Sequence, residues 1–341
     1  MAGLVTSLGS GAMTNPITDL SLSDCILVIG SNFAENHPII SRYVLDAKEQ
    51  GATLIVADPR FTPTAWQADI FLQLLPGTDI TLLNGLMNII LSEGIHKQDF
   101  IANRTTGFED LKKGLKKYKP ERVARETGVG AADMIAAARA YASARAASIV
   151  YCMGVTQHTC GTDTVINCAN LALMCGQIGR PGTGVNPLRG QDNVQGACDM
   201  GALVSVYPGY QSVADEAVRT SFARTWGTTA DLLPAQPGKT VVEMSHAAVK
   251  GDLKGMLIMG ENPVVGARSA DTGFVPGRSD AVVIHDTAYI FSPYYASFLN
   301  GIPSNCNKTR AWSSFFAVVT IVTSIPRNLS ILSYSISGKI N

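Results

Sequence analysis

The alternation of short apolar runs with longer helical stretches constrains the fold of this chain more than any other feature. Cys25 to Ile29 is an unbroken apolar run that ends at Gly30, which is typical of a buried parallel strand. Pro38 to Gln50 follows with apolar residues at helical spacing, Gly51 ends it, and Thr53 to Val56 is the next apolar run. The sequence therefore predicts a βαβ unit here, because parallel neighbouring strands need a crossover connection.

The same alternation continues through most of the chain. Further strands are predicted at Phe71 to Leu74, Ser148 to Cys152, Gly255 to Met259 and Ala281 to Ile284. Further helices are predicted at Asp79 to Glu93, Ala131 to Ala144, Asp163 to Cys175, Gln211 to Trp226 and Val241 to Lys250, and Leu111 to Lys119 reads as a lysine-rich, solvated helix face. This pattern predicts the α/β fold class, with helices on both faces of a largely parallel sheet.

Composition narrows the class of protein further. The chain has 341 residues, of which 46% are apolar, so it can bury one large core or two medium ones. Its formal net charge is zero, and we therefore expect no nucleic-acid partner. We see no secretory signal and no apolar run of about 18 to 20 residues, so a membrane location is not expected. Seven cysteines without a Cys-x-x-Cys pair favour reduced thiols in the cytoplasm.

A Gly- and Pro-containing run, Gly184 to Gly201, separates two helical stretches and is interpreted as a loop. It contains one Arg and several side-chain amides and acids, but no Lys or Glu. Gly and Pro bend a chain sharply, and Asn and Gln supply fixed donors and acceptors, so this composition suits the binding of a polar ligand. Arg189 would be the only cation of the site. The alternative is an ordered surface loop with Arg189 in solvent, and the run alone does not decide between them.

A weak internal repeat also bears on function. Leu27 to Asn32 with Asp58, and Leu257 to Asn262 with Asp286, share the order strand, Gly-x-Asn, helix, strand, Asp. In doubly wound sheets, ligands bind beyond the carboxyl ends of the strands, where such an acid can accept from ribose hydroxyls or base N–H groups. The repeat thus predicts two nucleotide-like sites. The alternative is a turn glycine in each half, and neither half has the Gly-x-Gly-x-x-Gly pattern of an ordinary NAD site.

These residues carry a resemblance to a known family. Gly184 to Gly201, followed by Tyr207-Pro-Gly-Tyr, is similar to the hallmark segment of the molybdopterin-dependent formate dehydrogenase catalytic (alpha) subunit, within the molybdopterin oxidoreductase superfamily. Further motifs occur in the family's order, namely Gly9-Ser-Gly-Ala-Met-Thr-Asn, Ala57-Asp-Pro-Arg, Met153-Gly-Val-Thr-Gln and Gly260-Glu-Asn-Pro. The resemblance extends from about Ala2 to Ala288.

The resemblance implies two doubly wound sheet domains, each binding one of two molybdopterin guanine dinucleotides that together hold one Mo or W. Residues 1–185 would form a first nucleotide-binding-like α/β portion, and residues 186–289 the substrate loop with part of the second. Residues 290–341 depart from the family. Thr287 to Asn341 contains no Asp or Glu, and we expect a non-homologous, poorly ordered tail.

The resemblance also implies roles for particular residues. Arg189 matches the substrate-site arginine, and a guanidinium can hold a carboxylate such as formate through two charge-assisted hydrogen bonds. Cofactor-lining positions are matched by Asn32, Glu35, Asp58, Arg60, Gly77, Asp79, Met153, Gln157 and Gln191, and on the second side by Asn262 and Asp286. His158, next to Gln157, is interpreted as structural, and no residue is predicted to ligate the metal.

Parts of the family's pattern are not found. The catalytic Cys or selenocysteine and the domain with a cysteine-bound 4Fe–4S cluster are expected before Met1. The resemblance therefore implies a central fragment of a formate dehydrogenase, inactive alone, whose parent oxidises formate to carbon dioxide and passes electrons to an iron–sulfur cluster in another domain or subunit. The alternatives are another molybdopterin oxidoreductase, such as a nitrate reductase, or a non-catalytic nucleotide-binding scaffold.

Overall fold

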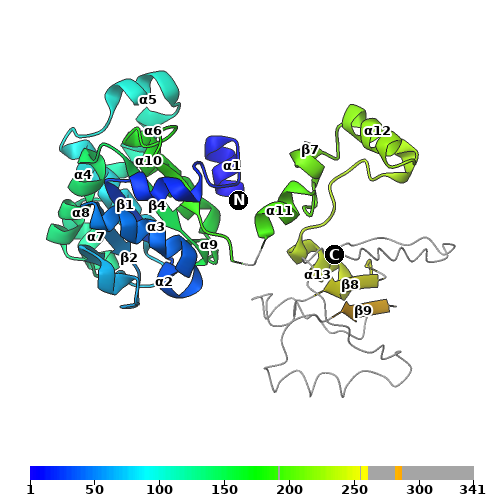
Figure 1. Cartoon of the computed structure of the whole chain (residues 1–341), viewed down its shortest axis with the longest axis horizontal. Helices are drawn as coiled ribbons and strands as arrows, with labels where there is room; N and C mark the ends of the chain where they lie inside the picture. The colour runs from blue at the N-terminus through cyan, green and yellow to red at the C-terminus, as the bar shows by residue number, and fades with distance from the viewer. Residues whose placement is uncertain (191–192, 254, 260–280, 286–341) are drawn as a thin grey trace, which may run out of the picture. The chain divides into compact units, whose positions relative to one another are not determined.

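A computed structural model describes residues 1–190, 193–253, 255–259 and 281–285. The chain forms two compact units, Met1–Gly190 and Gln191–Asn341 (Figure 1). Side chains are described up to residue 253, apart from residues 191, 192, 245 and 249. The predicted Gln191, Asn262 and Asp286, and the tail from residue 290, lie outside the described residues.

The first unit is built on a five-stranded parallel sheet in the order β3-β2-β1-β4-β5. The strands are β1 (Cys25–Ile29), β2 (Thr53–Ala57), β3 (Ile70–Leu72), β4 (Ala147–Tyr151) and β5 (Gly184–Pro187). Chain order reverses between β1 and β4, because β2 and β3 extend the sheet on one side and β4 and β5 on the other. The predicted α/β fold class is confirmed, and this reversal defines the topological switch point of a doubly wound sheet.

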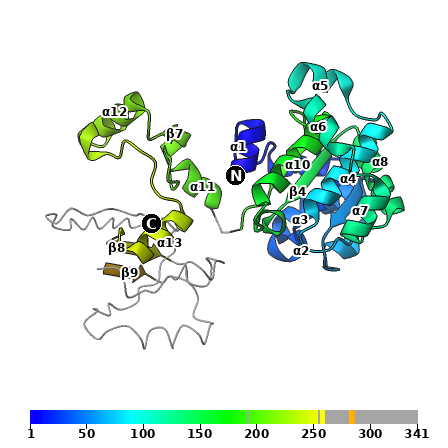
Figure 2. The ribbon, with the colours of Figure 1, turned by 180° about the vertical axis from the view of Figure 1, so that it is seen from behind.

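Helices cover both faces of this sheet, which explains why its strands are apolar throughout. Leu27 and Ile29 belong to one buried cluster with residues of α4 (Asp79–Ser92), α8 (Ala131–Ser143) and α10 (Gly161–Met174). Ile26 and Val28 belong to a second cluster with residues of α2 (Phe33–Asn36) and α3 (Pro38–Glu49). Successive side chains of β1 therefore point to opposite helix layers. Figure 2 shows the strands and helices of this unit from behind.

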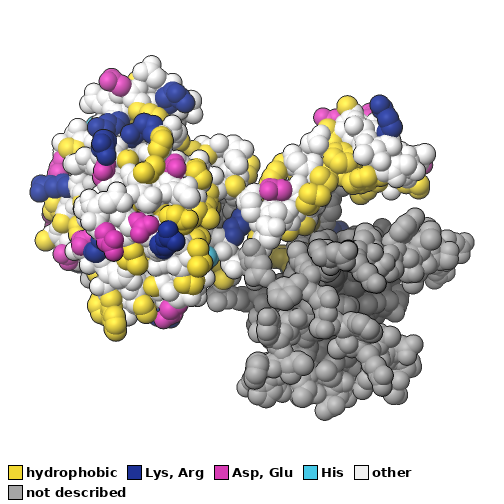
Figure 3. All heavy atoms as spheres, in the orientation of Figure 1, with side chains coloured by type: hydrophobic (Ala, Val, Ile, Leu, Met, Phe, Trp, Pro, Cys, Tyr) yellow, Lys and Arg dark blue, Asp and Glu magenta, His cyan; other side chains and the backbone are white. Residues whose placement is uncertain are grey.

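The other elements of this unit lie around the two layers. They are α1 (Ala2–Leu8), η1 (Ile17–Leu22), η2 (Ala65–Gln67), α5 (Gln98–Arg104), α6 (Phe108–Leu115), α7 (Pro120–Thr127) and α9 (Met153–Thr156). The lysines of α6 and of the turn after it are exposed, as predicted, and basic side chains gather over α6 in Figure 3. Among the described residues, no helix is long and apolar enough to cross a bilayer.

The second unit begins with α11 (Val194–Asp199), whose N-cap Asn193 accepts a hydrogen bond from the Gly196 amide at 2.9 Å. It continues with β6 (Val206–Tyr207), η3 (Pro208–Tyr210), β7 (Gln211–Ser212), α12 (Glu216–Thr225), η4 (Ala230–Leu232) and α13 (Val241–Lys250). Strands β8 (Gly255–Met259) and β9 (Ala281–His285) pair in parallel, with Leu257 opposite Val283. This pairing repeats that of β1 with β2, as the internal repeat predicts.

Two predictions about elements are wrong. The sequence predicts a loop from Gly184, but Gly184–Pro187 is the edge strand β5, because Val185 has an apolar cluster to fill and Pro187 is tolerated at an edge. A helix was predicted from Gln211, but α12 starts at Glu216. Asp215 caps it by accepting from the amides of Ala217 and Val218, and Gln211–Ser212 pairs with Val206–Tyr207 instead.

Candidate functional site

The candidate site is the carboxyl edge of the five-stranded sheet. Because all five strands are parallel, the segments that follow them emerge at the same edge. Asn32 follows β1, Asp58 follows β2, Met153 follows β4 and Arg189 follows β5. The fold therefore brings four of the predicted site residues to one edge, on both sides of the switch point.

At the switch point itself, the segments after β1 and β4 are in direct backbone contact. The Gly154 amide donates to the Gly30 carbonyl at 3.0 Å. A Cβ on Gly154 would lie 2.5 Å from that carbonyl oxygen, and Gly30 has φ +58°. Both positions therefore require glycine, one for close approach and one also for its left-handed backbone. The buried hydroxyl of Ser31, beside this contact, has no hydrogen-bond partner among the described residues.

Asn32 lies in a small hydrogen-bond network that joins β1 to the segment before η2. Its amide nitrogen donates to Glu35 Oε2 at 2.6 Å, and its oxygen accepts from Thr64 Oγ1 at 2.8 Å. Thr64 Oγ1 in turn accepts from the Ala34 amide at 3.1 Å. Asn32 is only 6% exposed, while Glu35 is exposed. The network orients the Glu35 carboxylate, so Asn32 has a structural partner and Glu35 is the member open to a ligand.

Asp58 is buried at the end of β2 and turns the chain. One carboxylate oxygen accepts from the Arg60 amide at 2.8 Å, which is the Asx turn expected of an Asp before Pro. Arg60 itself is exposed. This hydrogen bond leaves the other carboxylate oxygen of Asp58 available.

A second buried acid, Asp79, lies in the first turn of α4 and is electrostatically coupled to Asp58. Burial raises the pKa of the Asp79 carboxyl above its usual value, and the nearby Asp58 adds to the shift. The His158 Nε2 lies 4.0 Å from an Asp79 oxygen and 2.8 Å from the Gly154 carbonyl oxygen. His158 thus links the end of α9 with the acid, which agrees with a structural role.

Three further predicted residues present open surface near these strand ends. Gly77 has φ +81°, and a Cβ there would meet nothing within 4 Å. Met153 is 54% exposed, and Gln157, also exposed, donates from its amide to the Met153 sulfur at 3.2 Å. An uncovered thioether and a side-chain amide beside the switch point are suited to contact a flat heterocycle.

Arg189 is anchored through the residue before it and through its own side chain. The Leu188 amide donates to the Tyr151 carbonyl at 2.8 Å, which extends the pairing of β5 with β4 beyond Pro187. A guanidinium nitrogen of Arg189 donates to the Gly11 carbonyl at 3.3 Å. Burial raises the pKa of the Tyr151 hydroxyl, and the positive charge of Arg189 opposes that shift. Arg189 is therefore held at the end of the sheet and is not a freely solvated loop cation.

Cysteine chemistry is not prominent in the described residues. Burial raises the pKa values of Cys25, Cys168 and Cys175 to about 12, so these thiols stay protonated. Within the described part of the chain, no group of three or more His, Cys, Asp or Glu side chains could hold a metal ion.

Two residues that hydrogen-bond predicted site residues were not identified from the sequence. Thr64 bonds Asn32, and His37 bonds the backbone of Arg189 through its Nε2 at 2.6 Å. Both residues lie far from their partners in sequence, so no local pattern identifies them. The only signal was the Pro that follows His37, which indicates a helix start and says nothing of the imidazole.

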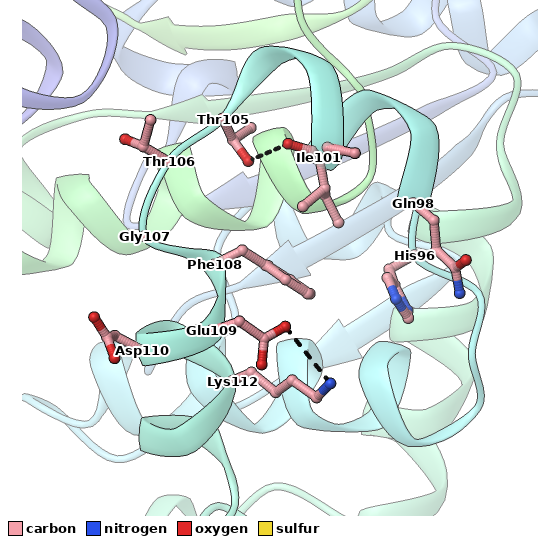
Figure 4. A pocket seen from close by; sticks show the side chains of 11 residues that line it. His96, Gln98, Ile101, Thr105, Thr106, Gly107, Phe108, Glu109, Asp110 and Lys112 are labelled. Carbon is pink, nitrogen blue, oxygen red and sulfur yellow. Dashed lines mark hydrogen bonds and ion pairs between the residues drawn. The ribbon is translucent and has the colours of Figure 1, made fainter.

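A cavity of about 520 Å³ lies elsewhere in the first unit, between α5 and the start of α6 (Figure 4). Ile101 and Phe108 form its apolar wall, and the His96 ring stacks on Phe108 with centroids 5.7 Å apart. Glu109 and Lys112 form an ion pair at its rim. None of the predicted site residues lines this cavity, so volume alone does not identify the functional site.

The sheet order and the polar residues at its carboxyl edge define the class of doubly wound α/β proteins. The sequence model of the molybdopterin oxidoreductase family matches residues 5–289. The chain belongs to the molybdopterin oxidoreductase family. Acetylene hydratase from Pelobacter acetylenicus has a similar fold, with a TM-score of 0.62 and 23% identity over 84% of this chain and 41% of that one.

The curated relatives are more similar in sequence. The F420-dependent formate dehydrogenase 1 subunit alpha of Methanococcus maripaludis is 51% identical over 265 residues, or 78% of this chain and 38% of its own length. Formate dehydrogenase H of Escherichia coli is 46% identical over 77% of this chain and 37% of its own length. The assimilatory nitrate reductase catalytic subunit of Bacillus subtilis is 38% identical over 76% and 36%, respectively. The chain thus spans less than two-fifths of the length of these relatives.

Proposed function

We propose that this chain supplies part of the active site of a molybdopterin-dependent formate dehydrogenase. The observation that carries the proposal is Arg189, which is anchored at the end of β5 on the same edge as the polar residues after β1, β2 and β4. The sequence identity of 51% with F420-dependent formate dehydrogenase alpha subunits supports formate as the substrate. The enzyme would oxidise formate to carbon dioxide and pass the electrons to an iron–sulfur cluster in another domain or subunit.

The residues of the edge are compatible with a guanine dinucleotide form of molybdopterin. Ser31 offers a buried hydroxyl that has no hydrogen-bond partner within the described part of the chain, and Gly77 leaves open space where a side chain would intrude. Asp58 and Asp79 offer acceptors for ribose hydroxyls or base N–H groups, and Met153 with Gln157 offers a face for a pterin. Glu35, Arg60 and the undescribed Gln191, Asn262 and Asp286 stay predictions as further contacts. Two-electron redox chemistry is what the Mo or W of the cofactor supplies when bound.

Arg189 would bind and orient formate. Its planar guanidinium can donate two parallel hydrogen bonds to a carboxylate and keeps its positive charge at any working pH. Formate has only one other group, its C–H bond. When both carboxylate oxygens are held, this C–H bond points in one fixed direction. Positioning of this kind lowers a barrier only when the rest of the catalytic site is present.

The 341-residue chain alone is accordingly not expected to oxidise formate. Arginine can orient the substrate, but within the described residues no group of three or more His, Cys, Asp or Glu side chains could hold a metal ion, and the sequence has no Cys-x-x-Cys pair. Dye-linked formate oxidation by the purified chain tests this statement, and turnover would contradict it.

The substrate role of Arg189 is tested in an assembled enzyme that contains this chain. Arg189→Lys keeps the charge but loses the planar fork, and we expect kcat/KM for formate to fall by about 10- to 100-fold. Arg145→Lys is the matched control, because Arg145 is an exposed arginine whose partner, Asp24, lies away from the site residues. An unchanged kcat/KM in Arg189→Lys would remove Arg189 from the substrate site.

A second candidate is nitrate reduction, since a nitrate reductase catalytic subunit is 38% identical to the chain. An assay of the same assembled enzyme with nitrate and a reduced dye distinguishes the two activities. Reduction of nitrate without oxidation of formate would favour this second candidate.

A further inference from the structure

The end of β5 is held by residues from distant parts of the chain. Besides the Gly11 contact of the Arg189 side chain, the Arg189 carbonyl oxygen lies 2.6 Å from His37 Nε2. His37 follows β1, whereas Arg189 follows β5, and β4 lies between these strands in the sheet. The imidazole therefore bridges the switch point and links two strand ends that do not pair with each other.

His37 is itself fixed in place. Its amide donates to the Phe33 carbonyl at 2.9 Å, its carbonyl accepts from the Ser41 amide at 2.9 Å, and Pro38 starts α3 immediately after it. The ring is half-buried, and its Nδ1 is buried without a hydrogen-bond partner among the described residues. The ring thus makes one polar contact there, and that contact is with Arg189.

A carbonyl oxygen can only accept, so Nε2 must carry the hydrogen of this bond. The bond fixes the peptide group that follows Arg189, and with it the direction from which the arginine side chain leaves the backbone. We propose that His37 is a positioning residue for Arg189, holding the guanidinium in the orientation that binds formate. This inference rests on the proposed function, since it assigns His37 a role in a substrate site formed by Arg189.

Two substitutions at position 37 separate the hydrogen bond from simple packing. His37→Gln places an amide N–H where Nε2 lies and should preserve the bond to the Arg189 carbonyl. His37→Asn has a shorter side chain, which cannot reach it. His96→Asn is the control for the general effect of losing a half-buried histidine, because His96 lies at the α5–α6 cavity.

The first measurement is the binding of ¹³C-formate to the 341-residue chain by NMR titration. We expect His37→Asn to weaken binding by about 3- to 10-fold, as for loss of one hydrogen bond, and His37→Gln and His96→Asn to bind as the wild type does. Equal affinities for His37→Asn and the wild type would overturn the positioning role. Arg189→Gln should abolish binding, and if it does not, or if the wild type binds no formate, the proposed substrate role of Arg189 fails instead.

The second measurement does not depend on formate. In ¹⁵N spectra of the wild-type chain, the His37 ring should be the Nε2–H tautomer, and the Arg189 carbonyl ¹³C shift should move in His37→Asn and return in His37→Gln. A ring in the Nδ1–H tautomer, or an Arg189 shift that is the same in all three proteins, would overturn the inference even if formate binds at Arg189.

Discussion

The interior of the five-stranded sheet and its carboxyl edge are built from opposite kinds of residue. Within β1, every side chain is apolar and at most 1% exposed, and each contacts a helix layer. One to three residues beyond the strands, the chain presents Asn32, Asp58 and Arg189. Asn32 and Arg189 are hydrogen-bonded to residues of other segments, and Asp58 closes a local turn. The interior accounts for the stability of the unit, whereas the edge keeps polar groups that the sheet does not need.

The polar residues of the edge, and not the apolar interior, are the candidates for function in this unit. Two buried carboxylates near one another, Asp58 and Asp79, raise the free energy of the folded state, and apolar residues would avoid that cost. The α5–α6 cavity has a volume of about 520 Å³, yet none of these groups lines it. Buried polar groups at the carboxyl edge of the sheet therefore indicate a ligand more strongly than cavity volume does.

The largest expected effect is a loss of stability on truncation of a side chain in the interior of the sheet. Leu27→Ala removes a side chain that is 1% exposed at the centre of the sheet, and we expect it to lower the free energy of unfolding by about 2 to 5 kcal/mol. Chemical denaturation measures this change. Leu22→Ala is the control, because Leu22 is 54% exposed and its truncation should matter little. Equal losses for the two variants would break the distinction between interior and surface.

The next effect concerns the contact at the switch point. In Gly154→Ala, the new Cβ would meet the Gly30 carbonyl at 2.5 Å, so we expect a loss of about 1 to 3 kcal/mol. Gly114→Ala in α6 is the matched control, since a Cβ there meets nothing within 4 Å and should stabilise the helix by about 0.5 to 1 kcal/mol. Thermal unfolding of both variants checks the opposite signs, and a neutral Gly154→Ala would mean that the segments after β1 and β4 are not packed together.

A smaller effect on stability is expected at the edge itself. Asp58→Ala removes the hydrogen bond to the Arg60 amide and should cost about 0.5 to 2 kcal/mol, while cofactor retention in the assembled enzyme falls much more. Pterin released by oxidation measures retention. Asp215→Ala removes an exposed cap of α12 and should cost similar stability without loss of pterin. If pterin content in Asp58→Ala is unchanged and only the melting temperature falls, Asp58 is a turn residue and nothing more.

The smallest expected effect is a dependence of the thermal stability on pH. Because burial raises the pKa of Asp79 in the folded chain, protonation favours folding, and this contribution is lost as the pH rises above the usual carboxyl value of 3.8 and through the raised one. Asp79→Asn should therefore melt higher than the wild type at pH 7, and the difference should shrink toward pH 4. A difference that is constant with pH, or that has the opposite sign, would contradict the buried, charged state of Asp79 at neutral pH.

The strands of the interior could be predicted because each is a short apolar run bounded by Gly or a polar residue. β5 could not, since Gly184, Asn186 and Pro187 are poor strand formers and only Val185 signals burial. Its pairing with β4 is decided by tertiary contact. The helix predicted from Gln211 failed for a related reason, because Gln211 and Ser212 pair with residues across the Pro208-Gly209 turn.

The residue types of the edge could also be predicted, but their partners could not. The repeat of Gly-x-Asn and Asp, with the family resemblance, singled out Asn32 and Asp58, and the parallel sheet brings both to the edge. The hydrogen bond between Asn32 and Thr64 joins residues that are 32 positions apart in the sequence. The bond between His37 and the Arg189 carbonyl joins residues that are 152 positions apart. Such contacts leave no periodic signal in a single sequence.

We propose that the carboxyl edge of the sheet binds a guanine nucleotide moiety, and a nucleotide titration tests this proposal. Guanosine diphosphate is added to the isotope-labelled 341-residue chain, and backbone amide shifts are followed by NMR. We expect saturable shifts at Asn32, Asp58, Asp79 and Gln157, with the amides around the α5–α6 cavity unmoved. Shifts confined to that cavity, or none at the strand ends, would contradict it.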